Sequence, residues 1–116
     1  MNKIWSNLTE ESQIAEIIAL SNSIPVYIFK HSTTCGISAQ AKENVKISFK
    51  NTDKPFLLYY LDLLKYRSIS NEVASKFNVH HQSPQLILVH NGEVTFTTSH
   101  HKIKTNILED SLSLLK

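Results

Sequence analysis

Two apolar periodicities alternate along this chain, and their order restricts the folds that it can adopt. Apolar side chains recur every three or four residues in four segments, as they do on one face of a helix: 8–23, 36–49, 68–77 and 104–116. Short runs rich in β-branched and aromatic residues, which are typical of strands, lie between them: 25–30, 56–62, 84–90 and 93–99. The predicted order of elements is therefore α-β-α-β-α-β-β-α.

The connections between these elements indicate an α/β fold. Strands joined through a helix are expected to run parallel, with a right-handed crossover. Asn91-Gly92 separates the last two runs and predicts a type I′ hairpin, so those two strands are expected to be antiparallel. We expect a mixed four-stranded sheet flanked by helices on both faces. Because the chain has 116 residues and no repeat or linker, it is predicted to form a single domain, 1–116.

Charge and hydropathy argue against several classes of function. The formal net charge is +2 and no run of five basic residues occurs, so no nucleic-acid partner is expected. The longest apolar stretches fall far short of the roughly 20 residues that span a bilayer, so no membrane segment is expected. The first residues, MNKIWSNLTEES, place polar and acidic side chains where a signal peptide has its apolar core. Together with the single cysteine, these features predict a cytoplasmic protein.

Cys35, the only cysteine, is the strongest candidate for a reactive residue. It lies between the first predicted strand and the helix that follows, where unpaired backbone N–H groups and the helix dipole favour negative charge. Such a position stabilises the thiolate, which is the nucleophilic form of cysteine. No acidic residue occurs between Glu16 and Glu43, and Thr34 and Ser38 carry hydroxyl groups that could donate to the sulfur.

Simpler roles stay open for these residues. A lone cysteine often packs as a small hydrophobe, although the polar run HSTTC argues against a buried Cys35. His31 is expected to be a loop residue, and Ser38 could be an ordinary residue of the first helical turn. The pairs His80-His81 and His100-His101 lack the spacing of metal ligands, so no metal site is expected.

Three segments of the chain resemble one protein family. They read FKHSTTCGISAQA, RSISNEVASKFNVHHQSPQ and NGEVTFTTSHHKI, in that order. They are similar to segments of the monothiol bacilliredoxins of the YtxJ type, which are glutaredoxin-like proteins of the thioredoxin superfamily. The resemblance covers most of the chain. It implies a thioredoxin-like fold and an oxidoreductase that removes bacillithiol from protein cysteines by disulfide exchange.

The resemblance also implies roles for individual residues. Cys35 matches the family's nucleophile, and Ser83-Pro84 matches the superfamily's cis X-Pro turn, which faces the sulfur and offers its backbone to the bound thiol. Lys30 is expected to attract the carboxylates of bacillithiol, although a solvated lysine at a strand end would look the same in the sequence. Bacillithiol is the implied co-substrate, with no cofactor bound permanently. S-bacillithiolated proteins are the implied partners, and we expect the enzyme to be a monomer.

Gly36 departs from the family pattern, which has proline after the cysteine. The sequence CGIS approaches the CGFS of monothiol glutaredoxins, some of which hold an iron–sulfur cluster between two subunits. Two alternatives therefore stay open: a cluster-binding carrier, and a thioredoxin-like interaction domain whose thiol is idle. Ser38 stands where a second cysteine might have stood, so in the exchange reaction the resolving thiol has to come from outside the chain.

Overall fold

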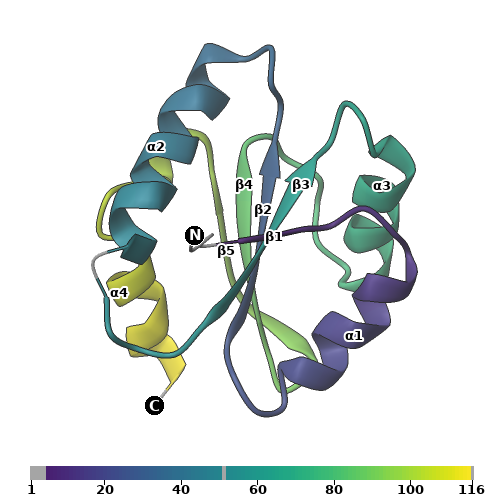
Figure 1. The fold of residues 1–116 in the computed structure, drawn as a ribbon, viewed down its shortest axis with the longest axis vertical. Helices are drawn as coiled ribbons and strands as arrows, with labels where there is room; N and C mark the ends of the chain where they lie inside the picture. The colour runs from purple at the N-terminus through teal and green to yellow at the C-terminus, as the bar shows by residue number, and fades with distance from the viewer. Residues whose placement is uncertain (1–4, 51, 116) are drawn as a thin grey trace.

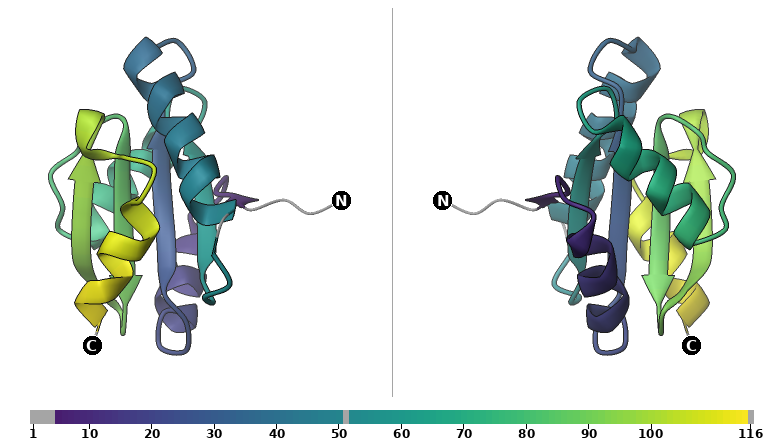
Figure 2. Two further views of the ribbon diagram at one scale, coloured as in Figure 1. Left: turned by 90° about the vertical axis from the view of Figure 1, so that its left-hand side faces the viewer. Right: turned by 90° about the vertical axis from the view of Figure 1, so that its right-hand side faces the viewer.

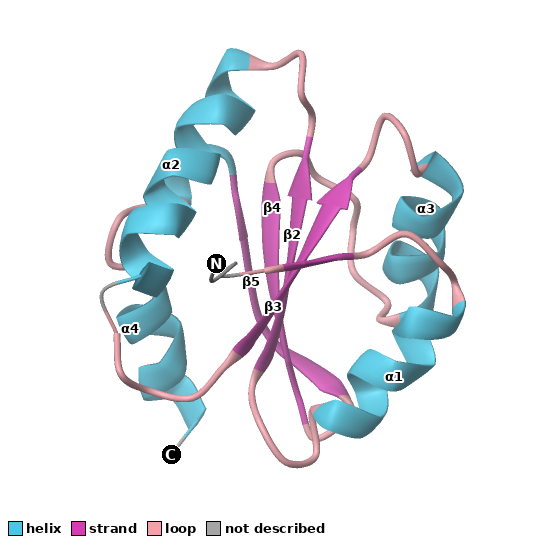
Figure 3. Ribbon diagram, in the orientation of Figure 1, coloured by secondary structure: helices cyan, strands magenta, loops and turns pink. Residues whose placement is uncertain are grey.

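A five-stranded mixed sheet with helices on both faces forms the structure (Figure 1). This computed structural model describes residues 5–50 and 52–115. Its elements, coloured by type in Figure 3, are β1 (Ser6–Asn7), α1 (Ser12–Leu20), β2 (Val26–His31), α2 (Gly36–Lys50), β3 (Leu57–Asp62), α3 (Arg67–Lys76), β4 (Gln85–His90), β5 (Glu93–Ser99), η1 (His100–Lys102), α4 (Ile107–Leu112) and η2 (Ser113–Leu115). The predicted α/β class is confirmed, as is the order of the eight elements expected from the sequence.

The sheet has one strand more than the four predicted. Its order is β1-β3-β2-β4-β5, with β1, β3 and β2 parallel and the last two strands joining antiparallel. The additional strand, β1, has only two residues and pairs with Tyr59 and Tyr60 of β3. Two exposed polar residues, Ser6 and Asn7, carry no apolar alternation, so their sequence contains no strand signal.

Two helices cover each face of the sheet (Figure 2). Helices α1 and α3 pack through Ile17 and Val73 on the face that receives Ile28 of β2. Helices α2 and α4 pack through Val45 and Leu108 on the opposite face. Because successive side chains of a strand point to opposite faces, all six residues of β2 are buried. The central strand is therefore apolar almost throughout, and its polar residues occur only where it ends.

Two predicted helices are shorter than their sequence patterns. The segment predicted as 8–23 becomes helical only at Ser12, because the Gln13 side chain accepts hydrogen bonds from the N–H groups of Thr9 and Glu10, at 2.8 and 2.9 Å, and holds that stretch in a turn. The segment predicted as 104–116 forms α4 from Ile107 and then the 3₁₀ turn η2. Residue 116 lies outside the described residues.

The predicted hairpin turn is confirmed. Asn91 and Gly92 have φ angles of 54° and 79°, and a type I′ turn requires positive φ at both positions. The turn is attached to the end of α1, because Ser21 accepts the Asn91 N–H through its carbonyl (2.9 Å) and the Gly92 N–H through its hydroxyl (2.8 Å). The turn thus holds the hairpin end of the sheet against the helix.

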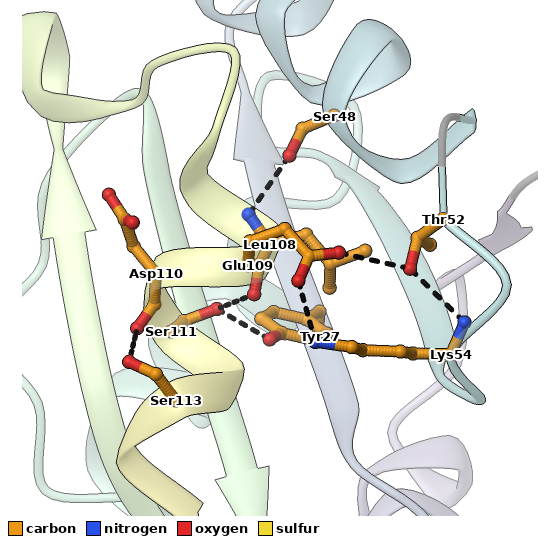
Figure 4. A network of polar contacts seen from close by, with 9 residues as sticks. All are labelled: Tyr27, Ser48, Thr52, Lys54, Leu108, Glu109, Asp110, Ser111 and Ser113. Carbon is orange, nitrogen blue, oxygen red and sulfur yellow. Dashed lines mark hydrogen bonds and ion pairs between the residues drawn. The ribbon is translucent and has the colours of Figure 1, made fainter.

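A polar network fixes α4 to the sheet and to α2 (Figure 4). The Tyr27 hydroxyl lies 2.5 Å from Ser111 Oγ, and the Leu108 N–H donates to Ser48 Oγ over 2.9 Å. On the surface, Lys54 and Glu109 form an ion pair of 2.6 Å. Burial is the main reason that the pKa of Tyr27 is raised to about 12, so its hydroxyl remains protonated at any physiological pH.

Candidate active site

Cys35 closes a four-residue loop between β2 and α2, at the top of Figure 1. Its N–H donates to the Ser32 carbonyl (3.2 Å), and its own carbonyl accepts the Ala39 N–H (3.0 Å). The second bond is the first i to i+4 bond of the helix, so Cys35 occupies the N-cap position of α2. The cysteine is free and partly exposed, so it does not pack as a core hydrophobe.

Cys35 lies at the N-terminal end of the α2 dipole. Helix α2 has 15 residues and no acidic residue in its first turn, so its dipole acts on the N-cap without local opposition. Gly36, the first helical residue, has open space around it, since a Cβ added there would meet nothing within 4 Å. Thr34 is exposed, and its Oγ1 lies 3.4 Å from Ser32 Oγ.

Ser38 lies in the position that a second cysteine would take, and its side chain is fully buried. Its Oγ accepts the Ser32 N–H over 3.0 Å and lies 2.8 Å from His31 Nδ1. A hydroxyl that accepts from Ser32 and donates to the imidazole satisfies all three groups. Ser38 thus ties the first turn of α2 to the end of β2.

His31 is a strand residue, which corrects the expectation of a loop position. It is the last residue of β2 and is only 4 % exposed. Its ring lies beside those of Phe29 and Tyr60, with centroids 5.8 and 5.6 Å away. Burial, reinforced by Lys42, lowers the pKa of His31 below its ordinary value, against the opposing effect of Asp62. The neutral imidazole is therefore the favoured form at pH 7.

The Ser83-Pro84 peptide bond is cis, as the family resemblance implied. Pro84 precedes Gln85, which pairs with Lys30 across β4 and β2. The Cys35 loop and the Ser83-Pro84 turn consequently leave the sheet at the same edge. The Pro84 carbonyl accepts the His100 N–H over 3.1 Å, which joins the turn to the segment after β5.

Gln85 is a site residue that the sequence analysis did not identify. It is buried, and its side chain holds the turn before β4: Oε1 accepts the Gln82 N–H (3.3 Å), while Nε2 donates to the His80 carbonyl (3.0 Å) and to Thr97 Oγ1 (3.2 Å). The available signal was a glutamine that opens an otherwise apolar inner strand. Such a residue needs partners, and the neighbouring loop provides them.

Lys30 points to the opposite face of the sheet from His31. Its side chain is fully buried, and its Nζ lies 3.1 Å from the Ser70 carbonyl of α3 and 3.2 Å from His81 Nδ1. Burial lowers the pKa of Lys30 to about 8. The amine does not reach the surface, so any effect of Lys30 on a bound thiol has to pass through its neighbours.

The structure thus brings the sequence-predicted residues into two groups on one edge of the sheet. Thr34, Cys35, Gly36 and Ser38 form the loop and first turn of α2, whereas Ser83 and Pro84 form the turn before β4. Lys30 lies beneath that edge.

Within residues 5–50 and 52–115, no group of three or more His, Cys, Asp or Glu side chains is arranged to hold a metal ion. None of the described helices has the length and apolarity needed to cross a bilayer.

Comparisons with known proteins place this geometry among thiol enzymes. The family model for monothiol bacilliredoxin BrxC matches residues 6–108. A solved structure described as a candidate "oxidoreductase with a thioredoxin fold" is 30% identical, with a TM-score of 0.81 and 94% of each chain covered. Spinach chloroplast thioredoxin f is 12% identical, with a TM-score of 0.72 and full coverage of both chains. Fasciola hepatica thioredoxin is 14% identical, with a TM-score of 0.70, and the match covers 95% of this chain and 98% of that one.

Proposed function

This chain belongs to the monothiol bacilliredoxin family, and we propose that it removes bacillithiol from S-bacillithiolated protein cysteines by exchange through Cys35. Family and fold make it a thiol–disulfide oxidoreductase in general terms. The proposal concerns the substrate and the route. Chain 1–116 acts as one thioredoxin-like unit, a cytoplasmic monomer, with bacillithiol as co-substrate and no permanently bound cofactor.

The first exchange frees the client protein. The Cys35 thiolate attacks the bacillithiol sulfur of the mixed disulfide, forming a bond between Cys35 and bacillithiol and breaking the bond to the client. The client sulfur leaves with the electron pair of the broken bond and takes up a proton from water. The N-terminus of α2 supports the attacking thiolate, since its N–H groups and dipole act on the N-cap residue.

The second exchange restores the enzyme. The thiolate of a free bacillithiol attacks the bacillithiol sulfur bonded to Cys35, releasing bacillithiol disulfide and the Cys35 thiolate. Over the cycle the client–bacillithiol disulfide is exchanged for bacillithiol disulfide: one free bacillithiol is consumed and the client regains its thiol. The helix N-terminus assists this step as well, because a stabilised thiolate is a better leaving group.

One observation carries the proposal: the chain's single cysteine is partly exposed at the N-cap of a long helix, while the hydroxyl at the resolving position is buried and bonded to His31. A serine hydroxyl does not attack a disulfide at neutral pH. The resolving thiol must therefore come from a second molecule.

Intact-mass spectrometry provides the decisive experiment. Wild-type protein is mixed with a bacillithiolated client, first without and then with free bacillithiol. We expect one bacillithiol on Cys35 in the first stage and unmodified enzyme in the second. Cys35→Ser should carry no adduct and leave the client modified, whereas Thr33→Ala, a change in the exposed neighbouring residue, should behave as wild type. A Cys35→Ser variant that frees the client as fast as wild type would contradict the mechanism.

The two alternatives give different outcomes in parallel assays. A cluster carrier would become coloured after anaerobic reconstitution with iron, sulfide and bacillithiol, and would form a dimer on doing so. An interaction domain with an idle thiol would show no pH-dependent acceleration of Cys35 alkylation beyond that of a free peptide thiol. A colourless protein with an adduct on Cys35 supports disulfide exchange over both.

A further inference from the structure

Lys30 is a buried cation without a partner of opposite charge. Its side chain is fully buried, and no carboxylate among the described residues forms an ion pair with it. Burying an ammonium group is costly unless other groups compensate its charge. Its two hydrogen bonds, to the Ser70 carbonyl and to His81 Nδ1, use two of its three N–H donors and do not neutralise its charge.

The contact with His81 carries this charge toward the surface. An ammonium group has donors and no acceptor, so Lys30 donates and His81 Nδ1 must be the unprotonated ring nitrogen. Nε2 then carries the hydrogen, and it lies on the side of the ring away from Nδ1. Because His81 is exposed, the buried charge polarises an N–H group that solvent and ligands can reach.

Further basic groups lie around the same imidazole. Lys30, Arg67 and His80 all act on His81 as like charges and, together with burial as the largest cause, lower its pKa. Arg67 is exposed and is the first residue of α3, a helix that has no acidic residue in its first turn and no side-chain cap. Four basic side chains therefore share one corner of the fold, and no carboxylate among the described residues is among the groups that shift the pKa of His81.

This basic corner lies on the same edge of the sheet as the cysteine. Lys30 pairs with Gln85, and the chain reaches Cys35 five residues after Lys30. His81 lies two residues before the cis Ser83-Pro84 turn. The Cys35 loop, the Ser83-Pro84 turn and the residues around His81 therefore lie at the same end of β2 and β4.

We propose that His81 and Arg67, backed by the buried Lys30, bind a carboxylate of the small thiol that Cys35 exchanges. This inference rests on the proposed function and adds to it a basis for selectivity: the corner selects acidic small thiols over neutral ones. A carboxylate accepts the paired N–H groups of a guanidinium together with the His81 Nε2–H. It also supplies the negative charge that the four basic side chains lack.

The test measures how fast Cys35 is loaded by two small disulfides. Bacillithiol disulfide carries carboxylates, and 2-hydroxyethyl disulfide is neutral. Both react with the same sulfur, so differences between variants report on recognition. The variants are Arg67→Ala and His81→Gln, and the control is Lys76→Ala, which removes an exposed positive charge from the other end of α3. Samples are quenched with acid, and the adduct is quantified by mass spectrometry.

We expect Arg67→Ala and His81→Gln each to slow loading by bacillithiol disulfide about 3- to 10-fold, the size of effect that a charge near a binding site has on association. Loading by 2-hydroxyethyl disulfide should change less than twofold, and Lys76→Ala should match wild type with both reagents. Raising the salt concentration from about 0.01 M to about 1 M shortens the Debye length from about 30 Å to about 3 Å. That change should slow only the acidic reagent, and only in proteins that retain Arg67 and His81.

Two other outcomes have separate meanings. If Arg67→Ala, His81→Gln and Lys76→Ala load equally fast with bacillithiol disulfide, the basic corner does not recognise the thiol, although the proposed function stands. If wild-type Cys35 is loaded by neither disulfide, the proposed function fails and this inference fails with it.

Discussion

Ser38 Oγ lies 2.8 Å from His31 Nδ1, so the residue at the resolving position of the loop is bonded to a buried neutral imidazole. The same oxygen accepts the Ser32 N–H. One hydroxyl thereby closes the loop that carries Cys35 from both sides. Ser38 therefore acts as a positioning residue, and its role is more than the absence of a second sulfur.

Replacing Ser38 by alanine should destabilise the protein. The change leaves the Ser32 N–H and His31 Nδ1 without a partner, and a buried unsatisfied group costs about 1–3 kcal/mol. Urea unfolding followed by circular dichroism measures the loss. Ser113→Ala removes an exposed hydroxyl that bonds the Asp110 carbonyl and should cost less than about 0.5 kcal/mol. Equal unfolding free energies for the two variants would mean that the Ser38 bonds contribute nothing.

Replacing Ser38 by cysteine should turn the monothiol cycle into a dithiol cycle. Residue 38 would then provide a thiol three positions after Cys35, in the same helical turn, so that it can displace the small thiol from Cys35. We expect the loaded Ser38→Cys variant to release its adduct without added thiol and to gain an internal disulfide, seen as a loss of about 2 Da in a reduced-versus-oxidised mass comparison. An adduct that persists for hours in this variant would show that side chain 38 does not reach the Cys35 sulfur.

Gly36 tolerates a larger side chain. A Cβ at this position meets no atom within 4 Å, and proline is favoured at the first helical residue because its fixed φ suits the helix. Gly36→Ala and Gly36→Pro should each raise the unfolding free energy by about 0.4–1 kcal/mol, mainly by restricting the unfolded chain. Thermal denaturation checks this, and Cys35 should still be loaded by small disulfides. A lower Tm for both variants would indicate that this backbone position needs glycine.

Stability should fall as the pH drops below about 6.5. The folded state lowers the pKa of His31, so below the unfolded value of about 6.5 the unfolded chain binds more protons and is favoured. His81 has the same sign of shift. The urea midpoint of the wild type should decline from pH 8 to pH 5, and the midpoint of His31→Gln should decline less. The His81→Gln variant, measured in the same way, gives the separate contribution of His81. Parallel pH profiles for wild type and His31→Gln would contradict this assignment.

Stability should also rise with pH on the alkaline side, because Lys30 has the same sign of pKa shift. Lys30 has its pKa lowered to about 8 by burial, so between about pH 8 and 10 the unfolded chain holds more protons, and stability should rise as the pH increases. Lys30→Met keeps a long apolar stem and removes the titrating group, so its stability should stay flat over the same range. Chemical denaturation at pH 7.5, 8.5 and 9.5 tests this. A wild-type midpoint that falls between pH 7.5 and 9 would contradict it.

The sequence predicted most of the frame because periodicity and turn chemistry are local signals. Asn91-Gly92 specified its turn, and the strand and helix runs appeared within a few residues of their observed bounds. The missing strand, Ser6–Asn7, depends on backbone pairing with β3, which leaves no pattern in two polar residues. The late start of α1 depends on one side chain, Gln13, bonding the preceding backbone.

The sequence indicated which residues gather at the candidate site, but it did not indicate most of the contacts that they make there. Cys35 and the cis Ser83-Pro84 bond were reached through the helix terminus and the family resemblance. The partners of Ser38 were not predicted. The sequence does not show that His31 still belongs to the buried strand, so it does not show that His31 can bond to Ser38. Gln85 was not identified for a related reason. Its side chain bonds the backbone of the preceding loop, and the sequence of β4 alone does not specify that loop.

The last two residues of β2 point to opposite faces, His31 toward α2 and Lys30 toward α3. The end of β2 therefore contacts both the cysteine loop and the basic corner beside the Ser83-Pro84 turn. Which face each of its residues points to is thus part of the site. A single residue inserted into β2 would exchange the two faces, placing the amine under the cysteine loop and the imidazole against α3. A graft of this site onto another scaffold must therefore keep each strand residue on its original face of the sheet, in addition to transferring the residues themselves.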